Sequence, residues 1–471
     1  MILDYRYLIS AHNDKLTQSA GKRPRFFVRT YGCQMNDRDS EKLSALLTEM
    51  GYETAESQDD ADFVLYNTCC VRETAEDKVF GHLSRLKRIK VDKPGLVIAV
   101  SGCMTQQPET AQKFQKSHPY VNIVFGTANR HRLPEFIWRA METGEQVVDI
   151  SGLDDPDENE ITNIPVTTRE YPHKAGVNIM YGCDNYCAYC IVPYVRGRER
   201  SRPIEEILQE IEELVADGVK EIMLLGQNVN SYAEGFPELL RRVNDVSGLM
   251  RIRFMTSHPK DFSNELISAV RDLPKLCKHV HLPLQSGSTR VLRDMNRKYT
   301  KEEYLALAHR LASAGIILST DIIVGYPGET EEDFEETLKV VREARFSGAF
   351  TFIYSKRTGT PAADRTDTVP RKTVTERFDR LTAELRPIMQ EINQAKVGKI
   401  MPVMVEEARD AETYKGRADD HGLIHFTSGE DFNMGDIVDV KITEAKSFYM
   451  VGVIAISVEN GESERHPKSA K

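Results

Sequence analysis

The sequence of 471 residues predicts an α/β protein, and it is long enough for two or three folded domains. Three observations support this. Short β-rich runs alternate with longer helical patterns up to about residue 125, six further strand and helix pairs follow from about residue 177, and short alternating strands with turn residues begin near residue 400. We therefore expect an N-terminal parallel α/β (Rossmann-like) domain, a central partial (β/α)6 TIM-like barrel and a small C-terminal β-barrel.

The N-terminal domain is indicated by four β-rich runs with helical patterns between them, at 26–30, 63–67, 96–101 and 121–125. Such alternation is typical of a parallel sheet covered by helices. The polar residues before it, 1–24, are expected to form an extension to which we assign no function. We place the domain itself at 25–141.

The second domain is expected to start after an acidic linker at 142–168, which contains the stretch DDPDENE. The barrel is placed at 169–393, with strands near Val177, Glu221, Arg251, His279, Ile317 and Ala349. The C-terminal module is placed at 394–457, with strands at 401–405, 423–426, 437–442 and 450–456. A polar tail occupies 458–471.

Composition limits the possible functions. The sequence has no run of about 18 apolar residues, and its N-terminus is charged, so we expect a soluble, cytoplasmic protein with no membrane partner. Eight cysteines are too sparse for a secreted disulfide scaffold, and six of them fall into two sets that suit metal ligands. The net charge of -10 requires that any nucleic-acid binding come from local basic patches.

The first cysteine set, Cys183, Cys187 and Cys190, follows the first expected strand of the barrel, at the end where barrel enzymes place their chemistry. Structural zinc normally takes four protein ligands, whereas a 4Fe-4S cluster held by three cysteines leaves one iron open to a small molecule. A zinc loop that recruits a distant fourth ligand is the alternative. The triplet therefore favours an iron-sulfur cluster with an open iron.

The second set, Cys33, Cys69 and Cys103, is scattered in sequence, but each cysteine follows an expected strand of the N-terminal sheet. The carboxyl ends of parallel strands share one edge, and that edge is where open α/β sheets bind ligands. A single cysteine there would more often be a buried core thiol. Three in matching positions predict a second three-cysteine cluster.

The first set, Cys-x3-Cys-x2-Cys with Tyr189 before its last cysteine, resembles the signature of radical S-adenosylmethionine (SAM) enzymes, and DIIVGYPGE at 321–329 resembles their adenine-binding segment. The sequence motifs around the second set resemble those of methylthiotransferases, particularly the tRNA-modifying MiaB branch. These motifs are TYGCQMN at 30–36, NTCCVRE at 67–73 and SGCM at 101–104. The similarity extends to 224–230, 282–288 and 354–360, and the C-terminal module resembles a TRAM domain, a small RNA-binding barrel.

This resemblance implies a radical SAM core, together with the cofactors, the substrate and the product of the reaction. Two 4Fe-4S clusters, one on each cysteine set, and two SAM molecules per turnover would convert N6-isopentenyladenosine to its 2-methylthio derivative at adenosine 37 of tRNA, the base 3′ of the anticodon. The resemblance also implies a flavodoxin- or ferredoxin-type electron donor, and we expect a monomer. Two alternatives stay open: the same chemistry on threonylcarbamoyl-adenosine or a ribosomal protein, and a non-catalytic metal-dependent RNA-binding or redox-sensing protein. The segment 30–36 argues against the first.

Where the family usually has one cysteine followed by a small residue, this chain has two in a row. We assign Cys69 as the ligand because it follows Asn67-Thr68 in the family's frame, and the sequence leaves exchange with Cys70 open. The matching motifs also supply candidate SAM contacts, which are Gln227, Asn228, Gln285, Ser286 and Gly325.

The basic loop after the first cysteine set supplies Arg196 and Arg198 as candidate tRNA contacts, and the TRAM-like module, which is not especially basic, supplies Lys415 and Arg417. A basic helix at 85–90 is equally consistent with a solvated face.

Overall fold

The computed structural model describes residues 4–70, 73–153, 169, 171–410 and 412–455, and of residues 20 and 73–77 it describes the backbone alone. The chain divides into two units, 1–385 and 386–471, which are considered separately. Among the described residues, no helix is both long and apolar enough to cross a membrane.

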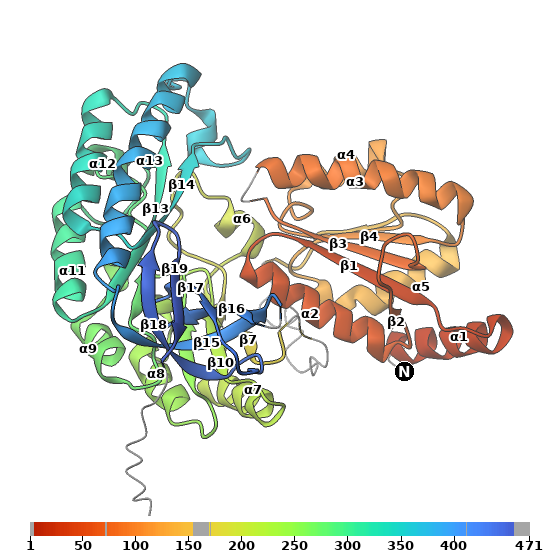
Figure 1. Cartoon of the computed structure of the whole chain (residues 1–471). Coiled ribbons are helices and arrows are strands. Elements are labelled where there is room, and N and C mark those ends of the chain that lie inside the picture. Colours follow the sequence, from red (N-terminus) through yellow and green to blue (C-terminus); the bar gives the residue numbers. More distant parts are fainter. Residues whose placement is uncertain (1–3, 71–72, 154–168, 170, 411, 456–471) are drawn as a thin grey trace, which may run out of the picture. The chain divides into compact units, whose positions relative to one another are not determined.

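Six parallel strands form the N-terminal sheet, in the order β2-β1-β3-β4-β5-β6 (Figure 1). The strands are β1 (Arg25–Tyr31), β2 (Glu53–Thr54), β3 (Phe63–Thr68), β4 (Val97–Gly102), β5 (Ile123–Phe125) and β6 (Val147–Asp149). The helices of this region are α1 (Tyr5–Ala20), α2 (Gln34–Glu49), α3 (Glu73–Asp92), α4 (Pro108–Ser117), η1 (Arg130–Arg132) and α5 (Leu133–Thr143). The parallel sheet predicted from the alternation is confirmed.

The central strand β3 is buried on both faces, as expected for a parallel strand covered by helices. Its residues alternate between two cores. Phe63 and Leu65 pack with α1, α2 and α5, while Val64 and Tyr66 pack with α3 and α4. Figure 1 shows α3 and α4 on one side of the sheet and α2 on the other.

Two segments differ from the sequence prediction. The expected extension contains helix α1, which is capped by Asp4 and anchored by the fully buried Ile9 and by a 2.9 Å hydrogen bond from Asn13 to the Met50 carbonyl. The expected linker begins with β6, which extends the sheet beside β5. Both elements present few apolar residues in a regular pattern, which is why periodicity alone did not indicate them. Residues 154–168 lie outside the described part of the chain.

The six expected barrel strands are confirmed, in two parallel groups ordered β7-β10-β11 and β12-β13-β14. A parallel bridge pairs Ile252 of β11 with Leu276, which lies just before β12. The strands are β7 (Lys174–Asn178), β10 (Glu221–Leu225), β11 (Arg251–Phe254), β12 (His279–His281), β13 (Ile317–Val324) and β14 (Gly348–Ile353). Figure 1 shows α11 (Lys301–Ser313) and α12 (Glu331–Ala344) on the outer side of β13 and β14.

The barrel strands are connected by helices and two short strands. The helices are α6 (Val192–Arg196), α7 (Ile204–Ala216), α8 (Phe236–Asn244), α9 (Asn264–Asp272), α10 (Thr289–Asp294), α11 (Lys301–Ser313), α12 (Glu331–Ala344) and α13 (Arg371–Gln394). Shorter elements are β8 (Met180–Tyr181), β9 (Arg200–Ser201), η2 (Val229–Ser231), η3 (Pro259–Asp261) and η4 (Pro361–Asp364). The antiparallel pair β8-β9 closes the loop that contains the first cysteine set.

The second unit is a closed five-stranded barrel, ordered β15-β16-β17-β19-β18. Its strands are β15 (Ile400–Ala408), β16 (Thr413–Ala418), β17 (Leu423–Thr427), β18 (Ile437–Ala445) and β19 (Met450–Ile454). The small β-barrel is confirmed, but β16 was not predicted as a strand. Its Gly416 leaves room for β15, because a Cβ there would lie 2.3 Å from the Met404 carbonyl oxygen. The expected tail lies outside the described residues.

Candidate active site

The first cysteine set lies on a tightly closed loop after β8. Gly182 has a φ of +74°, and a Cβ at this position would lie 1.9 Å from the Arg198 carbonyl oxygen, so only glycine fits. The Cys183 N–H donates to the Gly197 carbonyl at 3.2 Å, and the Cys190 N–H donates to the Cys187 carbonyl at 2.9 Å. The backbone therefore fixes where the cysteines lie.

Donor groups point at two sulfurs of this set. The Asn185 side-chain amide lies 3.4 Å from the Cys183 Sγ, and Arg297 Nη1 lies 3.4 Å from the Cys187 Sγ. Burial raises the pKa of Cys183 to about 11 and that of Cys190 to about 12. Buried thiols of this kind become thiolates when a metal replaces the proton, and N–H donors stabilise sulfur that carries negative charge.

The second cysteine set lies at the ends of three neighbouring strands, as predicted. Cys33 follows β1 and precedes α2, while Cys69 follows β3 and Cys103 follows β4. The Cys103 N–H donates to the Thr68 carbonyl at 2.9 Å. Gly102 permits this close approach, because it has a φ of +112° and a Cβ there would lie 2.1 Å from the Thr68 oxygen. The set therefore shares one edge of the sheet.

Two thiols of the second set, those of Cys33 and Cys103, have a lowered pKa. A hydrogen bond with Cys69, helped by the charge of Arg196, lowers the pKa of Cys33 to about 5. A hydrogen bond with Cys70 is the largest influence that lowers the pKa of Cys103, to about 7. Both Cys69 and Cys70 thus face other cysteines of this edge.

Each set offers three thiols and N–H donors, and this donor chemistry fits a 4Fe-4S cluster with an open iron. Across the part of the chain that the structure describes, no three His, Cys, Asp or Glu side chains are gathered around one point to hold a single ion. Ligands of a cubane cluster bind separate corners, so they need not converge in that way.

Helix α6 brings the two cysteine sets together. It starts two residues after Cys190. Its Val195, together with Ile191 just before the helix, packs against Cys70 and Cys103 in one buried cluster. The Thr127 hydroxyl, from the turn after β5, donates to the Val195 carbonyl. The loop of the first set therefore contacts the sheet edge that carries the second.

Arg196 does not lie on a tRNA-binding surface, so its prediction as a tRNA contact is wrong. Its side chain is 4 % exposed, and its guanidinium is bonded to the Cys103 Sγ, Asp39 and Asn36. A side chain buried in this way cannot reach a phosphate. Arg198 is 73 % exposed and pairs with Asp184 at 2.7 Å, so it remains a candidate.

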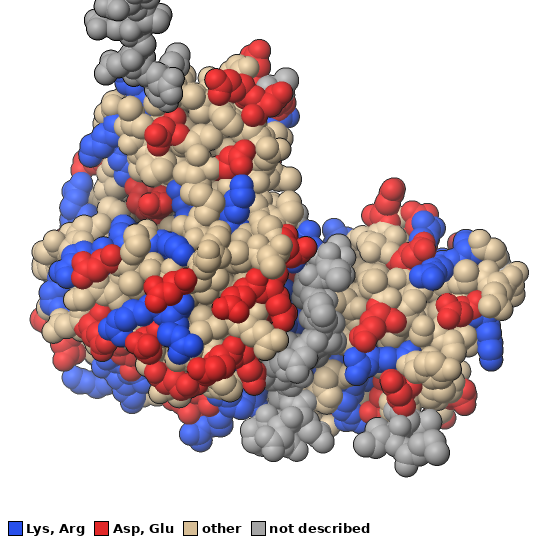
Figure 2. All heavy atoms as spheres, turned by 90° about the horizontal axis from the view of Figure 1, so that it is seen from below, with Lys and Arg blue, Asp and Glu red and all other residues tan. Residues whose placement is uncertain are grey.

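The two C-terminal candidates share the outer face of β16. Lys415 Nζ lies 2.8 Å from Glu407, and Arg417 donates to the His421 carbonyl at 3.1 Å. On the face of the molecule drawn in Figure 2, Lys and Arg are interspersed with Asp and Glu. This mixture agrees with the net charge of -10, which requires nucleic-acid contacts to be local.

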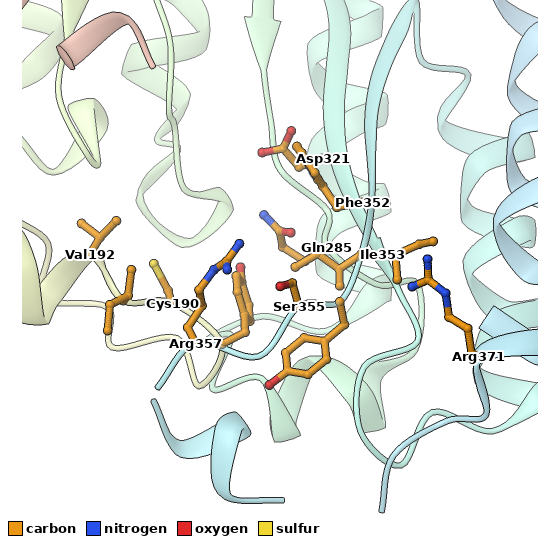
Figure 3. Close-up of a pocket in the computed structure, with 13 residues that line it drawn as sticks. Cys190, Val192, Gln285, Asp321, Phe352, Ile353, Ser355, Arg357 and Arg371 are labelled. Carbon is orange, nitrogen blue, oxygen red and sulfur yellow. The ribbon is translucent and has the colours of Figure 1, made fainter. Parts of the chain in front are cut away.

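A cavity of about 480 Å³ opens beside Cys190 (Figure 3). It is lined by Tyr189, Cys190, Ile191, Val192, Gln285, Asp321, Ile323, Phe352, Ile353, Tyr354, Ser355, Arg357 and Arg371. Figure 3 shows Cys190 and Val192 on one side and Arg371 on the other, with Gln285 and Ser355 between them. Its size and its mostly apolar wall with a few polar groups are typical of a small-molecule site.

Of the five candidate SAM contacts, Gln285 lines this cavity, with a φ of +66° that turns the chain at this position. Asn228 instead bonds Asp261 at 3.1 Å, and Gln227 bonds the Met35 sulfur. The carbonyl oxygens of both amides are buried without a partner among the described residues. Neither residue is part of the cavity wall.

The other two candidates have structural roles here. Ser286 is fully buried and accepts the Ser288 N–H at 3.2 Å. Gly325 has a φ of +77°, and a Cβ there would lie 2.5 Å from the Val374 side chain. The glycine therefore makes room for the start of α13 and does not line the cavity.

Sequence reasoning did not single out several residues of the site. Asp321, Ser355, Arg357 and Arg371 line the cavity, and the first three lie in motifs that had indicated the family without being chosen individually. Arg297, which contacts Cys187, is buried to 9 % exposure. A buried arginine far from the cysteines in sequence carries no pattern that could reveal it.

Comparisons with known proteins agree with this architecture. Family models match at 177–341 (radical SAM superfamily), at 25–126 (uncharacterized protein family UPF0004) and at 394–455 (TRAM domain). A solved radical S-adenosylmethionine methyltransferase, TsrM from Kitasatospora setae, shares the fold with a TM-score of 0.55 at 15% identity, over 72% of this chain and 77% of its own.

Curated relatives cover almost the whole chain. The tRNA-2-methylthio-N(6)-dimethylallyladenosine synthase of Clostridium tetani is 48% identical over 94% of this chain and 97% of its own length. The enzyme of the same description from Clostridium botulinum, strain Alaska E43, is 50% identical over 91% of this chain and 95% of its own. On this similarity, the chain belongs to the tRNA-2-methylthio-N(6)-dimethylallyladenosine synthase family of radical SAM enzymes.

Proposed function

We propose that this protein is a radical SAM methylthiotransferase that converts N6-isopentenyladenosine to 2-methylthio-N6-isopentenyladenosine, 3′ of the anticodon of tRNA. The observation that best supports this is the contact of α6 with the second cysteine set. Because Ile191 and Val195 pack against Cys103, chemistry at one set would occur next to the other. A reaction that joins two cysteine sites through one substrate requires such proximity.

Cys183, Cys187 and Cys190 would hold the 4Fe-4S cluster that the family implies, and Cys33, Cys69 and Cys103 would hold a second. When bound, the first would supply an electron for the cleavage of SAM, and the second would supply a site for sulfur. A C2 hydrogen of adenine is not acidic enough for ordinary general-base removal, which makes a radical route chemically reasonable. The chain's own part is to position these groups and to keep water out.

The cavity beside Cys190 would take SAM. Asp321 and Gln285 offer oxygen acceptors for hydroxyl groups, and Ile323, Phe352 and Tyr354 offer an apolar wall for a flat base. Arg357, on the same wall, carries the positive charge that a carboxylate needs. These residues now take precedence over Ser286 and Gly325, which are occupied elsewhere in the fold.

The tRNA would be held by local contacts, with Arg198 beside the first set and Lys415 and Arg417 on the TRAM barrel. Substitution of each by Gln should weaken tRNA binding and reduce its salt dependence. A flavodoxin- or ferredoxin-type donor would supply electrons in the cell, and the protein would act as a monomer.

Anaerobic reconstitution tests the proposal. The protein should take up close to eight iron and eight sulfide per chain. With dithionite and SAM it should release 5′-deoxyadenosine. Nucleosides of tRNA from a strain that lacks the gene should lose the 2-methylthio group from isopentenyladenosine and regain it with the intact gene. Loss from threonylcarbamoyl-adenosine, or from a ribosomal protein, would contradict the proposed substrate.

A further inference from the structure

Arg196 is the last residue of α6, and its guanidinium has three partners, all in the N-terminal domain. Nε lies 3.2 Å from the Cys103 Sγ, Nη1 lies 2.8 Å from an Asp39 carboxylate oxygen, and Nη2 lies 3.2 Å from the Asn36 side-chain oxygen. Five N–H groups in a rigid plane suit such a fan of contacts. A residue of the barrel thus donates directly to a cysteine of the sheet edge.

Asn36 contacts both Arg196 and a second cysteine. Its side-chain oxygen also lies 3.5 Å from the Cys33 Sγ, and its amide donates to the Thr68 carbonyl at 3.0 Å, just before Cys69. Through this one asparagine, the guanidinium is connected to the backbone and side chains around the whole second set. A shift of Arg196 would therefore move these groups together.

The charges around Arg196 do not cancel. Asp39 is 3 % exposed and accepts from Arg130 at 3.0 Å as well as from Arg196. One carboxylate thus faces two guanidinium groups, and the group of three retains one positive charge beside the thiols. A desolvated charge acts strongly on its neighbours, since water does not screen it.

We propose that Arg196 is a positioning residue for the site of Cys33, Cys69 and Cys103. From the barrel side it sets the hydrogen bonding and the local charge at that site, and it thereby connects the site to the loop of the first cysteine set. The inference rests on the proposed second cluster. Hydrogen bonds to the sulfurs and nearby positive charge stabilise the reduced, more negative state of an iron-sulfur cluster. Loss of the guanidinium should therefore make the second cluster harder to reduce.

The experiment isolates the second cluster by combining Cys183→Ala, Cys187→Ala and Cys190→Ala in the full-length chain. In this background we expect about four iron per chain. Arg196→Met should shift the reduction potential of the remaining cluster to a more negative value and alter its electron paramagnetic resonance spectrum. Arg196→Lys, which keeps the charge but not the planar fork, should give a smaller shift of the same sign.

Arg130→Met is the matched control, because Arg130 is also buried and bonds the same Asp39 oxygen, yet within the described part of the chain it makes no hydrogen bond to a sulfur. It removes one of the two guanidinium charges on Asp39 but no hydrogen bond to a sulfur, so it should shift the potential less than Arg196→Met does; equal shifts in the two Met variants, or no shift with Arg196→Met, would overturn the inference. If Arg196→Met does not fold, the Lys variant decides by the same comparison. A background protein that takes up no iron would instead refute the second cluster itself.

Discussion

Replacement of Glu210 by Gln should loosen the attachment of α2 to the barrel. The Glu210 carboxylate, 14 % exposed on α7, lies 2.6 Å from Arg38 of α2 and 2.6 Å from Arg202. Removal of one member of a buried ion pair typically costs about 3–5 kcal/mol, because the remaining charge stays desolvated. Arg38 keeps a second carboxylate, Glu41 at 2.7 Å, so we expect a loss near the lower end, about 3 kcal/mol.

Urea unfolding under anaerobic conditions measures this loss, followed by far-UV circular dichroism and by the fluorescence of Trp138, the one tryptophan of the chain. With a slope of about 3 kcal/mol per molar urea, a loss of about 3 kcal/mol lowers the midpoint by about 1 M. Glu206→Gln is the matched control, because Glu206 lies one turn earlier, is 51 % exposed and is 4.0 Å from Arg202. It should cost less than about 1 kcal/mol.

Glu210→Gln should also change how the free energy of unfolding falls at acid pH. Burial opposes ionisation of Glu210, but the charges of Arg202 and Arg38 outweigh it and lower its pKa. The stabilisation from Glu210 is therefore complete above the unfolded pKa of about 4.3 and is lost as the pH falls through the folded value. Equal midpoints for the two Gln variants, at neutral pH, would refute this account of the attachment.

Three further predictions follow from the same structure. Cys69→Ala should halve the iron content of the reconstituted protein, while Cys70→Ala should leave it intact, and the reverse result would make Cys70 the ligand. Ile9→Ala should cost about 2–5 kcal/mol in the urea transition reported by Trp138, because Ile9 is fully buried with α5; an unchanged midpoint would contradict this. Burial lowers the pKa of His258 to about 2, so protonation of this histidine in the unfolded chain should remove about 1.4 kcal/mol of stability between pH 7.5 and 5.5; urea unfolding of His258→Asn at the two pH values should lack this part of the loss.

Most of the sheet strands, though not β6 and β16, could be predicted because short β-rich runs mark them in the sequence. The rule that parallel strands share a carboxyl edge then places Cys33, Cys69 and Cys103 together without any coordinates. The role of Arg196 could not be predicted in that way. Its run of arginines indicates a surface, and the carboxylate that holds it inside, Asp39, lies 157 residues earlier in the chain.

The cavity was predicted only in part for a similar reason. Gln285 could be chosen because it lies in a matching motif, but the same reasoning chose Gly325, whose open side is filled by Val374 from a later helix. A motif shows only that a residue lies in a turn that resembles the family's. Whether the turn faces a ligand or another helix depends on packing that the motif does not contain.

The order of charges on α2 has a consequence for assembly of the fold. Arg38 and Asp39 are neighbours of opposite sign, and they meet Glu210 and Arg196 of the barrel region respectively. If α2 rotated by one residue during docking, a carboxylate would meet Glu210 or a guanidinium would meet Arg196, and buried like charges repel strongly. Helix α2, which follows Cys33 directly, can therefore pack in one orientation, and this places Cys33 in its position each time the chain folds.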